Sequence, residues 1–295
     1  MDSLEGQFDA IRRAVREVVL GLLVGFWLHG RGGTGKSFTV KQELEKLVPK
    51  FKPANITRLT ARGLFELIQD GPNSVHLIED CEQLFEDAQA MSLLRHALNV
   101  EPEDRTLFPD RVVTWKTAKG TETVRFTGGL ILVSNEIPAR FKPRCDALLS
   151  RLQVFEFNPT NEEVSHLMYR AAANGHARYD VEASFHLSPE ECREVVDVLI
   201  ETYDAVSQPL DMRMMEKSYN KALYLKNWEP NVDWREAVSS MVRRKLDTGG
   251  RPSKAQLREI AKKIHRTITG TEARKAAWKE QTKLGGTAFY KYLGR

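Results

Sequence analysis

The sequence is poor in cysteine and has no long hydrophobic run. Its three cysteines, Cys81, Cys145 and Cys192, are far apart and odd in number, so they provide neither a disulfide framework nor metal-ligand spacing. The longest nearly uninterrupted apolar run, 18–28, is shorter than the roughly 20 residues that a membrane-spanning helix needs. The first residues, Met-Asp-Ser-Leu-Glu, lack the basic segment of a signal peptide. Together these features predict a soluble, cytoplasmic protein with no membrane partner.

The charge of the chain is unevenly distributed. Over 295 residues the net charge is +4, with 41% hydrophobic and 28% charged residues, which is typical of one large or two ordinary globular domains. Residues 241–295 contain 15 Lys and Arg but only 4 Asp and Glu, which leaves the preceding 240 residues near −7. A basic tail on an acidic body predicts a polyanionic partner, and DNA is the first candidate. A solvated basic helical tail without a partner is the alternative.

A glycine-rich stretch fits the phosphate-binding pattern G-x-x-x-x-G-K-[ST]. The apolar run 24–28 before it predicts a buried strand, and 38–47 after it has helical spacing, which is the context that a P-loop requires. Lys36 is expected on the β- and γ-phosphates and Ser37 on Mg²⁺, at the start of a helix. The backbone around the phosphates is expected to come from Gly30, Gly32, Gly33, Thr34 and Gly35. A glycine-rich turn with an incidental lysine is the alternative.

Two carboxylates follow a second buried strand, 74–78. In P-loop enzymes one acid at this point holds Mg²⁺ and a neighbouring acid polarises the attacking water. Glu79 would sit at the metal position and Asp80 at the base position, with both available as metal ligands. The usual order begins with Asp, so the division of roles between the two acids stays open. Solvated acids at a strand end are the alternative.

A predicted hairpin precedes a third buried strand. Two alternating runs, 111–116 and 123–126, flank a Lys-Gly turn, and Lys116 and Lys119 lie at its tip as candidate phosphate contacts for DNA. A solvated hairpin that packs between subunits is the alternative. The strand 129–134 then ends in Asn135, whose amide is suited to orient a water or to contact a γ-phosphate.

The second half of the chain is predicted to be helical, without strands. Helical patterns cover 162–174, 190–205, 209–226 and 232–245, and a Gly-Gly-Arg-Pro linker follows. Two basic helices, a glycine turn and a final short helix then resemble a helix-turn-helix unit. We therefore expect an α/β core at 1–160, a helical lid at 161–246 and a basic tail at 247–295.

The order of the motifs resembles that of AAA+ ATPases. The resemblance covers about 18–234 and depends on GRGGTGKS, HLIEDCE, LILVSNEIP, ALLSRLQVFEF and PLDMRM. It implies a parallel-sheet P-loop core with a helical lid, ATP and Mg²⁺ as cofactors, and Asn135 as the sensor-1 residue. Arg151 matches the arginine finger that completes a neighbouring subunit's site, with Arg144 as its competitor, and Arg213 matches the sensor-2 arginine. For both matched arginines, an ordinary surface side chain is the alternative.

The resemblance implies a ring, a hexamer in the first instance, because the finger acts in trans. The stretch from SNEIP to SRLQVFEF is also similar to superfamily-three replicative helicases of phages and mobile elements. The expected function is Mg²⁺-dependent ATP hydrolysis by a DNA helicase or translocase. The alternatives are a protein-remodelling or loader ATPase that binds a protein partner through the tail, and a nucleotide-switched DNA-binding scaffold that does not hydrolyse ATP.

Overall fold

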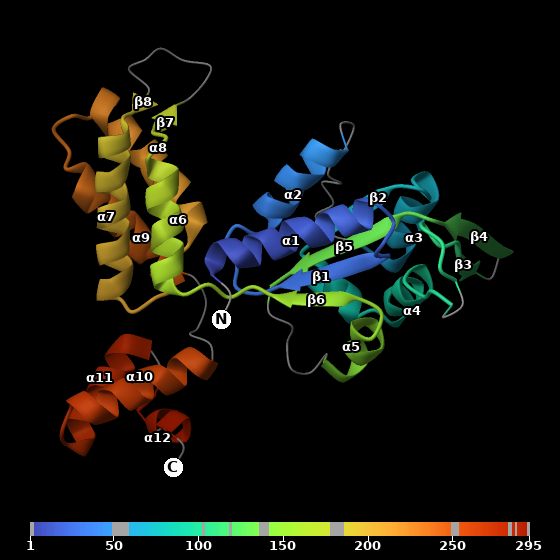
Figure 1. Ribbon diagram of the computed structural model, residues 1–295. Helices are drawn as coiled ribbons and strands as arrows, with labels where there is room; N and C mark the ends of the chain where they lie inside the picture. Colours follow the sequence, from blue (N-terminus) through green and yellow to red (C-terminus); the bar gives the residue numbers. More distant parts are fainter. Residues whose placement is uncertain are drawn as a thin grey trace.

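A computed structural model describes residues 3–48, 59–101, 104–117, 120–135, 142–177, 186–248, 254–282, 285–286 and 288–293. It confirms the α/β expectation with a parallel central sheet of the order β2-β5-β1-β6 (Figure 1). The strands are β1 (Gly25–His29), β2 (Val75–Glu79), β5 (Gly129–Ser134) and β6 (Gln153–Glu156). All four carboxyl ends therefore meet at one edge of the sheet.

Helices cover both faces of the sheet, as its hydrophobic strands require. Side chains alternate along β1, so Phe26 and Leu28 pack on one face and Trp27 on the other. The first face is covered by α1 (Leu4–Val19) and α2 (Lys36–Leu47), and the second by α3 (Ala61–Asp70), α4 (Ala88–Ala97) and α5 (Lys142–Leu149) (Figure 1). Two separate hydrophobic clusters therefore hold the sheet between its helices.

One helix of the core begins later than its sequence pattern predicts. The apolar spacing indicates a helix from Leu84, but residues Cys81–Phe85 form a 3₁₀ turn, η1, and α4 starts at Ala88. Asp87 causes the break, because its carboxylate accepts hydrogen bonds from the N–H groups of Gln89 (2.8 Å) and Ala90 (3.2 Å). The run Ile56-Thr57-Arg58-Leu59 also has strand composition, and it lies mostly outside the described residues.

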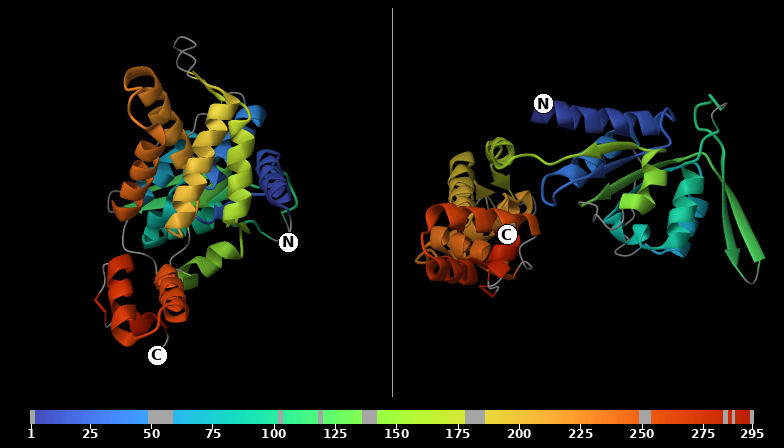
Figure 2. Two further views of the ribbon diagram at one scale, coloured as in Figure 1. Left: turned by 90° about the vertical axis from the view of Figure 1, so that its left-hand side faces the viewer. Right: turned by 90° about the horizontal axis from the view of Figure 1, so that it is seen from below.

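The predicted hairpin is present and projects from the sheet. β3 (Arg111–Thr117) pairs antiparallel with β4 (Gly120–Phe126), and the ribbon extends away from the helices (Figure 2, right). Arg111 is buried at its base and donates to the carbonyls of Pro109, Phe126, Ala97 and Gly128. The hairpin is therefore anchored at its base, with its tip left away from the core.

The second half contains a helical unit with one small sheet. Its helices are α6 (Asn161–Ala172), α7 (Pro189–Ala205), α8 (Met212–Trp228) and α9 (Trp234–Thr248), and they enclose a hydrophobic cluster of their own. The prediction of no strands here was wrong, because β7 (His176–Ala177) pairs with β8 (His186–Leu187). Strands of two residues are too short to produce the alternation by which strands are predicted.

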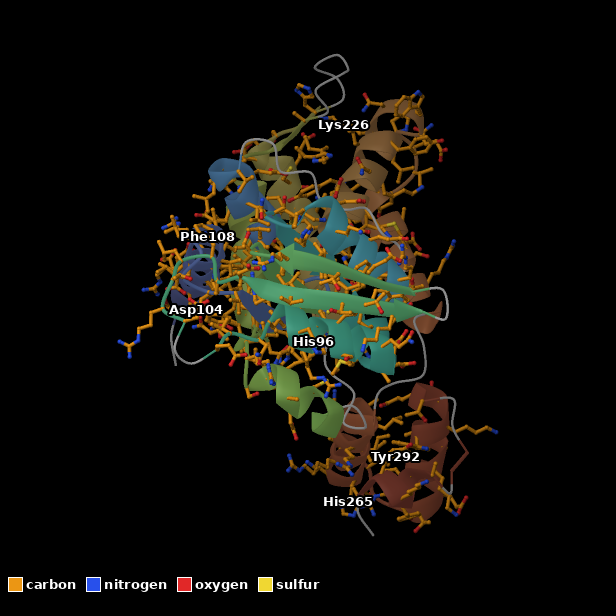
Figure 3. All side chains as sticks on the ribbon, turned by 90° about the vertical axis from the view of Figure 1, so that its right-hand side faces the viewer. His96, Asp104, Phe108, Lys226, His265 and Tyr292 are labelled. Atoms are coloured by element: carbon orange, nitrogen blue, oxygen red, sulfur yellow. The ribbon has the colours of Figure 1, made fainter. Side chains whose placement is uncertain are left out.

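The tail forms three helices around Trp278. They are α10 (Lys254–Thr267), α11 (Thr271–Thr282) and α12 (Ala288–Leu293), and Trp278 contacts the rings of Phe289 and Tyr292. His265 and Tyr292 lie in this bundle, apart from the sheet (Figure 3). Lys263 donates to the hydroxyl of Ser207 (3.2 Å) and so links the tail to the lid. Within the described ranges, no helix is long and apolar enough to cross a bilayer.

Candidate phosphate-binding site

The glycine-rich loop connects the carboxyl end of β1 to the start of α2. Gly33 and Gly35 have φ of +73° and +93°, which lie in the left-handed region that favours glycine. Gly35 is the residue immediately before α2, and α2 begins at Lys36. The positive end of the helix dipole therefore points into the loop, where it favours an anion.

Lys36 is buried within this loop. Its side chain donates to the carbonyl oxygens of Gly30 (2.9 Å) and Arg31 (2.6 Å), and the residue is only 6% exposed. Burial, and after it the nearby charge of Arg213, lowers the pKa of Lys36 from 10.5 to about 8. The loop thus holds an ammonium group whose charged form is destabilised in the absence of an anionic ligand.

Arg31 and Arg213 add two more positive charges near Lys36. Arg31 donates from Nη2 to the carbonyl of Leu210 (3.2 Å), and its buried Nε has no hydrogen-bond partner. Burial also lowers the pKa of Arg31. In the described part of the chain, no acid forms an ion pair with any of these three cations. A polyphosphate would neutralise this charge and satisfy the orphaned donor, so the residues fit a nucleotide.

The acids that follow β2 interact with different lysines. Glu79 pairs with the Nζ of Lys41 on α2 at 2.5 Å. Asp80 has a left-handed backbone, with φ of +48°. Asp80 and Glu82 are the acids whose charges act on Lys36, and the effect of Glu82 is the larger. Glu82, from η1, was not singled out from the sequence, although it lies within the same HLIEDCE motif.

Asn135 lies directly against the loop. A Cβ placed on Gly32 would lie 3.1 Å from the Oδ1 of Asn135, so the amide faces the glycine backbone. The backbone N–H of Asn135 donates to Glu82 Oε1 at 2.6 Å. This bond joins the end of β5 to the turn that follows β2. The structure therefore brings Asn135, Asp80 and Glu82 to the same edge of the sheet as Lys36.

The lid returns to this loop at the start of α8. The N–H of Met212 donates to the carbonyl of Gly33 (2.9 Å), and Asp211 caps α8 by accepting from the N–H of Arg213 (2.9 Å). A Cβ at Gly33 would overlap the Asp211 carboxylate, so this contact requires glycine. Lys245 of α9 forms an ion pair with Asp211. Neither Asp211 nor Lys245 was among the predicted site residues, because no local pattern marks them.

Arg151 lies at the opposite end of the sheet from the loop. It precedes β6, whose first residue pairs with Phe26 and whose last pairs with His29, the residue before the loop. At about 3.3 Å per residue, these strands hold Arg151 more than about 10 Å from its own phosphate site. Its guanidinium donates to the carbonyl of Ala147 (2.5 Å) and to Asn99 Oδ1 (3.3 Å).

Three other predicted positions lie apart from the loop or outside the described side chains. Lys116 is exposed on β3 of the hairpin, whereas Lys119 lies outside the described residues. Arg144 falls within α5, but its side chain is also outside the described set.

Ser37 occupies the second position of α2, directly after Lys36.

The site also fits Mg²⁺ in the way that ion is usually held beside phosphates. Magnesium takes one or two carboxylates together with phosphate oxygens and keeps several waters. No cluster of three or more Asp, Glu, His or Cys side chains that could hold a metal occurs among the described residues. The hydroxyl of Ser37 and one acid after β2 would supply the protein ligands, in keeping with a metal that the nucleotide brings with it.

Comparisons with known proteins find similarity at the level of solved structures alone. No protein-family model and no curated protein matches the sequence. Domain III of the Thermotoga maritima replication initiation protein DnaA is 15% identical, with a TM-score of 0.44 over 78% of this chain and 88% of that one.

Two further structures are similar to this chain. The Aeropyrum pernix Orc1 protein, solved in complex with DNA, is 11% identical, with a TM-score of 0.45 over 100% of this chain and 82% of that one. A point mutant of Thermotoga maritima RuvB is 14% identical, with a TM-score of 0.40 over 99% of this chain and 88% of that one. At these values, the assignment of a function depends on the geometry of the site.

Proposed function

We propose that this chain is an AAA+ ATPase that hydrolyses ATP with Mg²⁺ as part of an oligomer acting on DNA. One observation carries the proposal: a glycine loop, a buried lysine, two acids, a strand-end amide and a lid arginine converge at one sheet edge. Three cations that form no ion pair among the described residues favour a polyphosphate over a neutral ligand. The motif resemblance of the sequence supports the same class.

Each group in the site has a separate task in this proposal. The loop N–H groups and Lys36 bind the phosphates, and Arg213 contacts them from the lid. Mg²⁺, when held by Ser37 and an acid after β2, would supply charge neutralisation at the phosphate oxygens. Asp80 polarises the attacking water, and Asn135 holds that water in line. Glu82 keeps Asn135 in place through the 2.6 Å bond to its backbone.

The position of Arg151 supports assembly into a ring. A guanidinium at the far end of the sheet cannot reach its own phosphate site, but it is accessible to a second subunit. An arginine supplied in trans stabilises charge in phosphoryl transfer and contributes about 10³–10⁵ in rate. A closed ring, with a hexamer as the first expectation, gives every site such an arginine.

DNA is proposed as the substrate because of the hairpin and the tail. The three-helix tail carries exposed cations on α10 and α11, among them Arg258, Arg266 and Lys279. The projecting hairpin adds Lys116. A helicase or translocase of the phage or mobile-element type uses such contacts to hold phosphates. A protein-remodelling or loader ATPase, whose tail binds a protein partner, is the second candidate.

ATP turnover measured with and without single- and double-stranded DNA tests the proposal. We expect turnover that DNA stimulates, and loss of both turnover and tight ATP binding in Lys36→Ala. A chain ending at Gly249 should keep basal turnover and lose most of its salt-sensitive DNA affinity. DNA-independent turnover favours the loader, and DNA affinity that survives truncation assigns the tail to protein contacts. A complete lack of turnover leaves the nucleotide-switched scaffold.

A further inference from the structure

One face of α8 carries a line of cations that ends in two aromatic rings. Residues spaced by four, four, three and four positions are Arg213, Lys217, Lys221, Tyr224 and Trp228. At about 100° per residue they fall within a sector of roughly 80°, and at about 1.5 Å per residue they extend over roughly 22 Å. We call these five residues the α8 stripe. It begins at the phosphate site and runs away from it along the lid.

The aromatic end of the stripe is exposed and held in one orientation. Tyr224 and Trp228 are stacked, with ring centroids 5.4 Å apart and an interplanar angle of 27°, although they are 42% and 56% exposed. The hydroxyl of Tyr224 donates to Glu229 Oε1 at 2.7 Å, which fixes that ring. The Nζ of Lys221 lies 5.3 Å from the centroid of the Tyr224 ring.

The residues of the stripe are not part of the lid's hydrophobic core. The lid core uses other faces of α8, through Met214, Tyr219 and Leu223. Lys226 (labelled in Figure 3) falls on the opposite side of the helix at about 100° per residue, and it pairs with Glu191 at 2.5 Å. The cations of the stripe take part in no ion pair among the described residues. Exposed, stacked aromatic rings next to free cations indicate a ligand with both flat apolar groups and negative charge.

We propose that the α8 stripe binds single-stranded nucleic acid. Lys217 and Lys221 contact backbone phosphates, and an unpaired base continues the stack formed by Tyr224 and Trp228. Proteins that bind single strands without sequence preference combine a basic track with aromatic platforms in this way. A duplex keeps its bases stacked on one another and presents mostly phosphate, so it would use the cations and make no stack with the rings.

This inference deepens the proposed function on DNA and rests on it. Arg213 is both the first residue of the stripe and a cation of the phosphate site, so one helix connects nucleotide and strand. A movement of α8 when nucleotide binds would move the aromatic platform by the same rotation. The stripe therefore assigns the strand-gripping surface to the lid, in addition to the hairpin and the tail.

The test uses the full chain and a fluorescent oligo(dT) or a duplex of the same length, followed by anisotropy. We expect Tyr224→Ala with Trp228→Ala to weaken oligo(dT) binding at least about fivefold while duplex binding stays the same. Lys217→Ala with Lys221→Ala should reduce the salt slope by about 1.4, because each single-strand phosphate contact contributes about 0.7. Trp228→Phe retains a stacking ring and should keep the affinity.

Two matched controls separate the stripe from general effects on the lid. Tyr169→Ala removes a lid aromatic ring that is 39% exposed on α6, and Lys226→Ala removes a cation from the opposite side of α8. Both should leave oligo(dT) binding unchanged. Tryptophan emission should also be quenched by oligo(dT) in the natural chain, and this quenching should be reduced in Trp228→Phe.

The proposal is overturned if the double aromatic variant binds oligo(dT) as the natural chain does. It is also overturned if that variant changes the mass of the assembly, because the stripe would then be a subunit contact. Quenching by neither oligonucleotide would overturn it as well. Basal ATP turnover is measured in the natural chain and in the double aromatic variant. Turnover in both, without a loss of oligo(dT) binding in the variant, overturns the stripe alone. Absence of turnover in the natural chain would instead be a failure of the proposed function.

Discussion

The two ends of the central sheet differ in what they hold. At the carboxyl end, the loop, the acids, Asn135 and the lid are joined by internal hydrogen bonds, such as Met212 to Gly33 and Asn135 to Glu82. At the amino end, Arg151 contacts a backbone carbonyl and a neutral amide, and the base of the hairpin leads into β5. One end holds the proposed phosphate site, and the other holds Arg151 and the base of the hairpin.

Two strands connect these ends. β5 is buried along its whole length and connects the hairpin to Asn135 without interruption. β6 similarly connects Arg151 to the segment that contacts the loop, where the side chain of Asn158 accepts from the N–H of Arg31 (2.8 Å). β5 lies between β2 and β1, whereas β6 is the edge strand and pairs only with β1.

The largest expected effect comes from removing Arg151, the arginine at the amino end that we propose completes the site of a neighbouring subunit. We expect Arg151→Ala to bind ATP almost normally and to lose about 10³–10⁵ in turnover, because the charge stabilised in trans is lost. Mixing Arg151→Ala with Lys36→Ala should restore part of the turnover, since some interfaces then pair an intact finger with an intact loop. Turnover of the mixture is the measurement.

Arg144→Ala is the matched control for this experiment. It removes the competing arginine of α5 and should leave turnover close to normal. If Arg144→Ala has the large effect and Arg151→Ala has none, the finger has been assigned to the wrong residue. Mixed assemblies of confirmed composition that show no recovery would exclude action between subunits.

A second test sharpens the roles of the acids at the carboxyl end. Asp80→Asn should retain ATP binding and lose about 10²–10⁴ in turnover, because an amide does not accept the proton of the attacking water. Glu79→Gln should weaken Mg²⁺-dependent nucleotide binding. Calorimetry of nucleotide binding with and without Mg²⁺, beside steady-state turnover, measures both. If Asp80→Asn abolishes the metal dependence instead, the two roles are exchanged.

A third test asks whether the hairpin at the amino end grips DNA. Replacing Lys116 and Lys119 with Ala should leave basal turnover intact and abolish its stimulation by DNA. Arg125→Ala is a suitable control, because Arg125 pairs with Asp110 (2.7 Å) on the same ribbon but away from its tip. Stimulation and strand movement that persist in the double variant would indicate a hairpin that only packs between subunits.

The smallest expected effect concerns the protonation of Lys36. Its pKa in the free protein is about 8, below its ordinary value of 10.5, and bound phosphates favour the charged form. ATP binding above about pH 8 should therefore take up a proton, and affinity should fall by no more than about tenfold per pH unit. Calorimetry in two buffers of different ionisation enthalpy measures the uptake, which Lys36→Ala should not show.

The same lowered pKa has a consequence for folding. Because the folded state holds the Lys36 proton less tightly than the unfolded chain, this group destabilises the fold below about pH 8. That destabilisation is relieved as pH rises from about 8 toward 10.5. Bound nucleotide should remove this contribution.

The sheet and most helices could be predicted from the sequence because each depends on a local pattern. The buried runs 74–78 and 129–134 have strand composition, and the spacing in 190–205 is helical throughout. The two-residue strands of the lid and the break at Asp87 could not be predicted in this way. They depend on pairing and capping that apolar periodicity does not encode.

The residues of the candidate site likewise fall into those that a local motif marks and those that only the folded chain brings together. The loop and the acids lie on short motifs, so they could be named from the sequence. Asp211 reaches Gly33 from far along the chain and Lys245 pairs with Asp211, and only the folded lid brings these residues together. Glu82 lies within a recognised motif, but its bond to Asn135 joins the turn after β2 to the end of β5, and these segments are far apart in the sequence. Contacts between segments that are far apart in the sequence cannot be predicted from the spacing of its apolar residues.

The three cysteines, spread over the chain, provide a built-in measure of local opening. All are buried, and burial raises the pKa of each thiol. A buried thiol reacts with an alkylating reagent only when the structure around it opens. Cys81 directly follows Asp80, Cys145 lies in α5, and Cys192 lies in the lid core. Cys81 and Cys145 share one hydrophobic cluster, so their labelling rates would record opening of the core beside Asp80, and the rate of Cys192 would record opening of the lid.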